Sequence, residues 1–350
     1  MYPLSDIRVL VTGGSGFLGS YCIIALLNAG YQVRTSIRSL SKVSSLKEAL
    51  KNGGLTNSDF ERLSIVEAEL TEDKGWDKAV EGCIYVLHVA SPLSTQQPKN
   101  EDDLIIPARE GTLRVLRAAK RAGVKRVVLT SAFNAIGYGH PDRTEPFNED
   151  SWSNERSKLG AYPRSKVIAE RAAWDFVKSD EGAGLELTVI NPVAIFGPVL
   201  STEIASSIHI IRNYMSGEMP ASLQLYMSVV DVRDVAALEV LAMTNPAAKG
   251  ERFIAVSPPG GWMNDVALIL KERLPEASKK VSTRVLPNFV ARFLSLFDPR
   301  IATFANELGN RKPSSNEKAV RVLGWKPRSR EEAIIDTAQS LLEFGVVKAT

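Results

Sequence analysis

The sequence predicts an α/β fold in which helices cover both faces of a doubly wound parallel sheet. Short apolar runs alternate with helical patterns through the first two-thirds of the chain, and this alternation is typical of parallel strands joined by helices. A glycine-rich turn with Gly13, Gly16 and Gly19 follows the first apolar run. Together the two observations indicate a Rossmann-type sheet, joined by a smaller, interleaved C-terminal lobe.

Six strands and four helices are expected in this core. Runs such as Val127–Leu129 are apolar throughout, as in strands that are covered on both faces. The expected strands are Arg8–Thr12, Gln32–Ile37, Leu63–Glu67, Tyr85–Val89, Arg126–Thr130 and Glu186–Asn191. The expected helices are Leu18–Asn28, Trp76–Val80, Thr112–Ala122 and Ser165–Lys178.

The pattern changes after Pro192, where short segments rich in Pro, Ser and Gly mix with helical stretches. Residues 1–191 are therefore expected to form the nucleotide-binding core, joined by about 229–257, where a strand end precedes a helix. Residues 192–228 and 258–350 are expected to form the substrate-binding lobe. Ligands of such sheets bind at the carboxyl ends of the strands, so this lobe would cover that edge.

Composition excludes several classes of protein. Of the 350 residues, 44% are hydrophobic and 24% charged, as in ordinary globular proteins. A net charge of +3 is too small to indicate nucleic acid. No apolar run is long enough for a membrane span, and no secretory signal is recognisable, so a cytoplasmic protein is expected. Cys22 and Cys83 are expected to be buried thiols, and three histidines without ligand spacing predict no metal site, with His88 a packed strand residue.

The glycine turn has the spacing of a dinucleotide site. Gly13 would permit the tight turn, Gly16 would let the backbone approach a pyrophosphate, and Gly19 would let the helix lie close to the sheet. The positive end of the following helix then faces the phosphates. After the second strand the chain carries Arg38 and Lys42 and no acidic residue before Glu48. A guanidinium binds a 2′-phosphate, whereas a carboxylate would repel it, so NADP (as NADPH) is the expected cofactor.

Tyr162 and Lys166 are four residues apart near the start of a long helical segment, so both side chains lie on one helix face. A free tyrosine has a pKa near 10, and a neighbouring ammonium favours the phenolate. The pair therefore predicts general acid–base chemistry.

At these residues the chain resembles the extended short-chain dehydrogenases/reductases, and within them the dihydroflavonol reductase-like and cinnamoyl-CoA reductase-like group. The resemblance covers nearly the whole chain. It rests on Val11–Gly19, Val33–Arg38, His88–Pro92, Pro107–Thr112, Val115–Ala119, Arg126–Ser131, Tyr162–Lys166, Val230–Asp234 and Leu323–Pro327.

The resemblance implies reduction of a carbonyl by NADPH, with Tyr162 as proton donor. It implies that Lys166 binds the nicotinamide ribose and lowers the pKa of Tyr162, and that a serine hydroxyl polarises the carbonyl. Beyond the glycines, Arg38, Lys42 and the Tyr162–Lys166 pair, it implies cofactor contacts at Phe17, Leu18, Glu69, Leu70, Val89, Ala90, Ser91, Thr130, Pro192, Val193, Ile195 and Ser207.

One position departs from the family pattern. Relatives usually end the fifth strand with Thr-Ser-Ser, and the second serine is catalytic, whereas here that position is Ala132. Ser131, one residue earlier, should point to the opposite face. Either the strand end bulges and brings Ser131 to the site, or Asn134 or Thr130 donates instead, or Tyr162 acts alone. Ser131 is taken here as the expected catalytic partner.

The substrate class follows from the expected pocket segments, Phe133–His140, Phe196–Leu200 and Met219–Tyr226. They are largely apolar and aromatic, which suits an aldehyde or ketone better than a phosphorylated substrate. A nucleotide-sugar epimerase or dehydratase of the same family and a non-catalytic dinucleotide sensor are the alternatives. A monomer or homodimer that binds a small carbonyl compound is expected.

Overall fold

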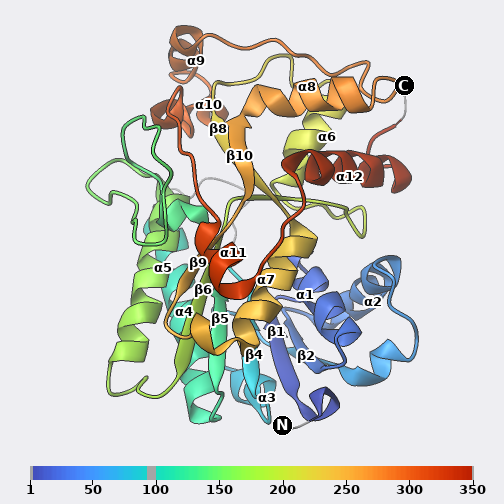
Figure 1. The fold of residues 1–350 in the computed structure, drawn as a ribbon, viewed down its shortest axis with the longest axis vertical. Coiled ribbons are helices and arrows are strands. Elements are labelled where there is room, and N and C mark those ends of the chain that lie inside the picture. Colours follow the sequence, from blue (N-terminus) through green and yellow to red (C-terminus); the bar gives the residue numbers. More distant parts are fainter. Residues whose placement is uncertain (1–2, 93–99, 349–350) are drawn as a thin grey trace.

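The computed structural model describes residues 3–92 and 100–348. Its core is a sheet in the order β3-β2-β1-β4-β5-β6-β9 (Figure 1), and every pair of neighbouring strands is parallel. The Rossmann-type fold is thereby confirmed. The strands are β1 (Arg8–Thr12), β2 (Gln32–Ile37), β3 (Leu63–Glu67), β4 (Tyr85–His88), β5 (Arg126–Thr130), β6 (Glu186–Pro192) and β9 (Arg252–Ala255).

Helices cover both faces of this sheet. One buried cluster packs α1 (Phe17–Asn28), α2 (Val43–Asn52) and α7 (Val232–Thr244) against Val9, Leu87 and Val128. The other packs α3 (Trp76–Val80), α4 (Asp102–Arg121) and α5 (Ala161–Lys178) against Leu10, Val86 and Val127. Successive residues of a strand thus serve opposite faces, as strand geometry requires.

Two helices begin earlier than the sequence predicts. α4 begins at Asp102 rather than near Thr112, and Pro107 lies inside it. Proline removes a backbone hydrogen bond of a helix, but Leu104, Ile105 and Ala108 are buried around it, which offsets the loss. α5 begins at Ala161, directly after Gly160 with its φ of 77°. Tyr162 therefore lies in the first turn of α5 and Lys166 one turn later.

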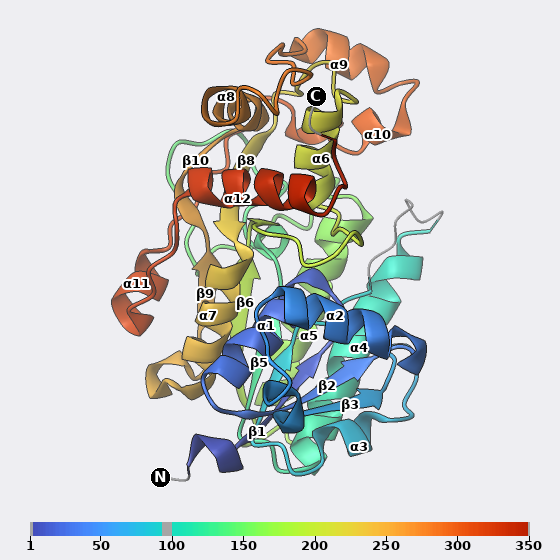
Figure 2. The ribbon, with the colours of Figure 1, turned by 90° about the vertical axis from the view of Figure 1, so that its right-hand side faces the viewer.

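A second, three-stranded sheet lies beyond the carboxyl ends of the core strands (Figure 2). It has the order β10-β8-β7 and consists of β7 (Ala194–Phe196), β8 (Tyr226–Asp231) and β10 (Ser257–Trp262). A separate buried cluster joins it to α6 (Ile208–Ser216), α8 (Met263–Arg273) and α12 (Arg330–Glu343). The helices α9 (Asn288–Leu294) and α10 (Pro299–Ala302) lie at its outer side, and α11 (Glu317–Leu323) packs on the core.

The chain passes between the two sheets several times. β6 leads directly into β7, β8 into α7 of the core, and β9 back into β10. β9, which the sequence does not reveal as a strand, pairs with β6 and completes the main sheet. Within the two described stretches of the chain, no helix has both the length and the apolar character that crossing a bilayer demands.

Candidate active site at the carboxyl edge of the main sheet

The glycine turn between β1 and α1 is closely packed. Gly13 has a φ of +70°, and a Cβ atom there would lie 3.0 Å from the Cα of Ala90, which follows β4. A Cβ at Gly19 would overlap the carbonyl oxygen of Gly13. Thr12 fixes the same corner, because its hydroxyl accepts from the backbone N–H of Ala90 at 2.9 Å. Only glycine therefore fits at positions 13 and 19.

This turn leaves the start of α1 open to a ligand. Gly16 is the N-cap residue, and no side chain of the described residues caps the helix. The first N–H groups of a helix lack partners within it, and here they belong to Phe17, Leu18 and Gly19. A cradle without side chains at a helix N-terminus fits a pyrophosphate. The residues present thus fit a dinucleotide.

The basic residues after β2 differ in how they are engaged. Arg38 is exposed and has no hydrogen bond or ion pair with any described residue. Lys42 donates to Glu203 at 2.7 Å. Arg34 is turned away, because its guanidinium donates to the carbonyls of Lys78 and Glu81 at the end of α3. Arg38 is the cation that remains for a phosphate.

The other expected cofactor residues line the ends of β3, β4, β6 and β7. Leu70 packs against Gly111 of α4, and Glu69 accepts the indole N–H of Trp76 through its backbone. Val89 and Ala90 are half-buried. Val193 is bound through its backbone to Ala255, and the hydroxyl of Ser207 donates to the carbonyl of Ile195 at 2.6 Å. Pro192 is the last residue of β6.

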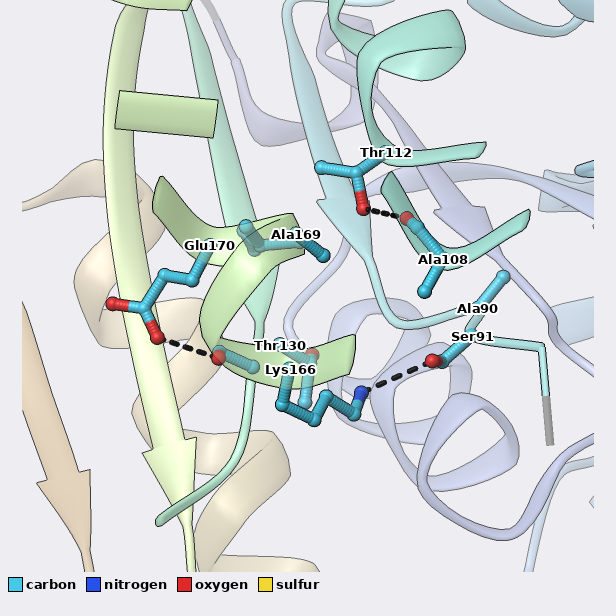
Figure 3. Close-up of a pocket in the computed structure, with 10 residues that line it drawn as sticks. Ala90, Ser91, Ala108, Thr112, Thr130, Lys166, Ala169 and Glu170 are labelled. Atoms are coloured by element: carbon cyan, nitrogen blue, oxygen red, sulfur yellow. Dashed lines mark hydrogen bonds between the residues drawn. The ribbon is translucent and has the colours of Figure 1, made fainter. Parts of the chain in front are cut away.

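Ser91 connects the Tyr162–Lys166 pair to the glycine turn. The Nζ of Lys166 donates to the hydroxyl of Ser91 at 3.0 Å (Figure 3) and lies 5.8 Å from the centroid of the Tyr162 ring. Ser91 directly follows Ala90, which contacts Gly13. A cavity of about 20 Å³ lies beneath Lys166 and Ser91, which is room for one water molecule. Of Tyr162, 37% is exposed, so part of this residue is accessible from outside.

Burial shifts both pKa values of this pair. Desolvation raises the pKa of Tyr162 to about 12. It also lowers the pKa of Lys166 to about 8, although the carboxylate of Glu170 opposes this shift. The ammonium donates to Ser91 rather than to Tyr162, and the expectation that Lys166 lowers the pKa of Tyr162 stays a prediction.

The end of β5 does not bulge, and its two hydroxyls are bound to buried carboxyl groups on opposite faces. Thr130 donates to Glu239 of α7 at 2.6 Å, and Ser131 donates to Glu170 of α5 at 2.6 Å. Ser131 is itself buried. The hydroxyl of Ser131 is thus held by Glu170, on the opposite face from Thr130 as strand alternation requires, and its expected role as the partner of Tyr162 stays a prediction.

Glu170 is the centre of a polar cluster that the sequence reasoning missed. Besides Ser131, it accepts from Asn191 of β6 at 2.7 Å and from Arg252 of β9 at 2.6 Å. Glu170 follows Lys166 by four residues. This spacing is the one signal in the sequence that could have placed Glu170 on the same helix face.

Several expected pocket residues belong to the core instead. Phe133 is buried with Phe147 and Ile254, and Phe196 is buried in the cluster of the smaller sheet. Tyr226 is half-buried and packs edge to face against Trp262, with ring centroids 5.5 Å apart. Three other expectations are confirmed: Cys22 and Cys83 are buried free thiols, and His88 is buried, with its pKa lowered to about 3 by desolvation.

Comparison with known proteins agrees with this geometry. The model of the NAD dependent epimerase/dehydratase family matches residues 9–255. The chain is 34% identical to a dihydroflavonol 4-reductase of Zea mays over 77% of this chain and 74% of the maize protein. It is 31% identical to the NADPH-dependent methylglyoxal reductase of Saccharomyces cerevisiae, over 96% of this chain and 98% of the yeast protein.

A solved structure also resembles this chain. The crystal structure of yeast methylglyoxal/isovaleraldehyde reductase Gre2 complexed with NADPH superposes with a TM-score of 0.79 and 29% sequence identity. The match covers 97% of this chain and 99% of the yeast chain. Core and smaller lobe are therefore both shared with that structure.

Proposed function

Because the chain belongs to the NAD dependent epimerase/dehydratase family, as its resemblance to extended short-chain reductases predicts, we propose that it reduces an aldehyde or ketone to the alcohol with NADPH. The observation that carries the proposal is the Tyr162–Lys166 pair, which Ser91 links to the glycine turn. The printed names of the relatives support reduction, and two of them name NADPH.

The residues that would hold the cofactor follow from the site. The open N-terminus of α1 would bind the pyrophosphate, and Arg38 would bind the 2′-phosphate. Ser91 and Lys166 would bind near the nicotinamide ribose. NADPH, when bound, supplies the hydride that a carbonyl carbon accepts.

Tyr162 would supply the proton to the carbonyl oxygen. With a pKa of about 12 its phenol is protonated at neutral pH, so it is ready to act as an acid toward the developing alkoxide. The ammonium of Lys166 would stabilise the phenolate left after proton transfer.

The cofactor and the substrate would be bound by different parts of the chain. Residues 1–191, joined by about 229–257, would hold the cofactor, while 192–228 and 258–350 would bind the carbonyl compound. An apolar aldehyde or ketone suits the half-buried Ile195, Met219 and Leu225 at this lobe. The cytoplasmic location and the monomeric or homodimeric state stay predictions.

The test is to follow NADPH absorbance with a panel of aldehydes, ketones and a dihydroflavonol, for the wild type and for Tyr162→Phe. We expect turnover with NADPH, and a loss of about 10²–10⁴-fold in Tyr162→Phe, the contribution of one general acid. Full activity in that variant would remove Tyr162 as proton donor. Purified protein that retains NAD and does not consume NADPH would overturn the proposed reduction.

A further inference from the structure

The carbonyl oxygen of a substrate beside Tyr162 needs a second hydrogen-bond donor that β5 does not supply. Ala132, at the position where relatives usually carry the catalytic serine, has only a methyl group. The two hydroxyls before it are already donated to Glu239 and Glu170. Breaking either bond would leave a buried carboxyl group short of a donor, which costs about 1–3 kcal/mol.

We propose that the side-chain amide of Asn134 is this second donor, so that Asn134 replaces the missing serine as a catalytic residue. The inference rests on the reductase function proposed above. A carboxamide has two N–H donors, and asparagine serves elsewhere as an oxyanion donor. Asn134 lies only two residues beyond Ala132.

The backbone around Asn134 is fixed, so its side chain has few choices. It lies in the 3-10 turn η4 (Phe133–Ala135), directly after β5. Phe133 packs into the cluster with Phe147, and Ala135 packs against Val167 of α5. Asn134 is half-buried between these two residues, in a turn that packs through Ala135 on Leu159 and Val167, which lie on either side of the Tyr162–Lys166 pair in the sequence.

Ser153 holds this turn by two hydrogen bonds. Its hydroxyl donates to the backbone carbonyl of Asn134 at 2.7 Å and accepts from the backbone N–H of Tyr138 at 2.8 Å. These bonds use the main chain of Asn134 and leave its carboxamide available. A donor held by a rigid turn is preorganised, which is what stabilisation of a developing oxyanion requires.

Tyr138 connects Asn134 to the proton donor. Burial raises the pKa of Tyr138, and the carboxamide of Asn134 acts to lower it. Tyr138 packs against Ala135, Leu159 and Val167, and the last two lie on either side of the Tyr162–Lys166 pair in the sequence. The ammonium of Lys312 lies over the ring of Tyr138, 4.7 Å from the ring centroid, and this contact holds the ring in place. In this proposal Tyr138 is a positioning residue for the carboxamide of Asn134.

The chemistry balances without a proton from Asn134. The electron pair that reduces the carbonyl carbon comes from NADPH, which becomes NADP. The proton on the product oxygen comes from Tyr162, which solvent later reprotonates. Asn134 keeps both protons and contributes a hydrogen bond that strengthens as charge develops on the oxygen.

The experiment compares Asn134→Ala, Asn134→Asp and Ala132→Ser/Asn134→Ala with the wild type. We expect kcat to fall by about 10²-fold in Asn134→Ala, as for loss of one oxyanion donor. Asn134→Asp keeps the shape but replaces the donor by a carboxylate, so it should lose at least as much. The new serine of the double variant should restore about tenfold or more of the kcat lost in Asn134→Ala.

Two controls separate catalysis from folding. Asn148→Ala makes the same change at an exposed position of the same connection between β5 and α5, and should leave kcat unchanged. The Kd for NADPH and the Tm should be the same in Asn134→Ala as in the wild type, because a purely structural role would move them.

The outcomes are distinct. A wild type that never oxidises NADPH overturns the proposed function and this inference with it. An active wild type with unchanged kcat in Asn134→Ala overturns the donor assignment alone. So does a kcat loss that comes with a lower Tm, or one that the serine at position 132 does not rescue.

Discussion

Glu239 should make the stability of this protein fall with pH across the neutral range. Its carboxyl group on α7 is fully buried, accepts one hydrogen bond from Thr130 at 2.6 Å, and has a second oxygen without a partner among the described residues. Burial raises its pKa from 4.5 to about 8. The folded protein therefore keeps this proton at neutral pH, where the unfolded chain has lost it.

The sign and the size of the effect follow from linkage. The stabilisation that comes from the raised pKa of Glu239 is fully present below 4.5, the pKa in the unfolded chain. It is lost as the pH rises through about 8, the pKa in the folded protein. In that window the free energy of unfolding falls by about 1.4 kcal/mol per pH unit for one proton. From about pH 5.5 to about pH 7.5 this single group should remove about 2.7 kcal/mol.

Glu239→Gln tests this value. Glutamine keeps the acceptor for Thr130 and cannot ionise, so the variant should lack this part of the pH dependence. Urea unfolding at both pH values gives the free energies by linear extrapolation, and the wild-type decrease should exceed that of the variant by about 2.7 kcal/mol. Glu48→Gln, at an exposed position, should behave as the wild type does. Equal decreases in the wild type and in Glu239→Gln would refute the reasoning.

Two predictions concern the cofactor and the catalytic pair. Arg38→Asp should lower kcat/KM with NADPH by about 10–100-fold, since a hydrogen bond to a charged group contributes about 1.5–3 kcal/mol, and should spare NADH; an unchanged preference in steady-state assays would remove Arg38 from the phosphate site. The rate of reduction should decline above pH 8, because the buried ammonium of Lys166 loses its proton there. Lys166→Arg stays charged and should move this decline to higher pH, whereas a wild-type rate that is flat past pH 9 would contradict the role of the ammonium.

The strands of the core could be predicted closely because their signal is local. β1, β2, β3 and β5 have the predicted bounds. β9, Arg252–Ala255, was missed because it lies after Pro192, where the sequence no longer shows a clear alternation of strands and helices. Its partner β6 ends 60 residues earlier in the chain, and the buried Arg252 is bound by Glu170 of α5 and by the carbonyls of Glu149 and Ser151.

The site was predictable where one element supplies the chemistry. The glycine turn and the Tyr162–Lys166 spacing each lie within one segment of chain, and the structure links them through Ser91. The hydrogen bond of Ser131 to Glu170 could not be predicted, because Glu170 lies on another element, 39 residues further along. The pKa of Tyr162 could not be predicted either, because desolvation depends on everything that surrounds the phenol.

The repeated crossing of the chain between its two sheets bears on protein engineering. A gene fragment that ends after β6 would encode neither β9 nor α7, so Ile190 would lose its neighbouring strand and the apolar side chains of α1 would meet water. Specificity therefore could not be transplanted from a relative as one contiguous cassette. A chimaera would have to exchange several short inserts and keep the intervening core segments of the host.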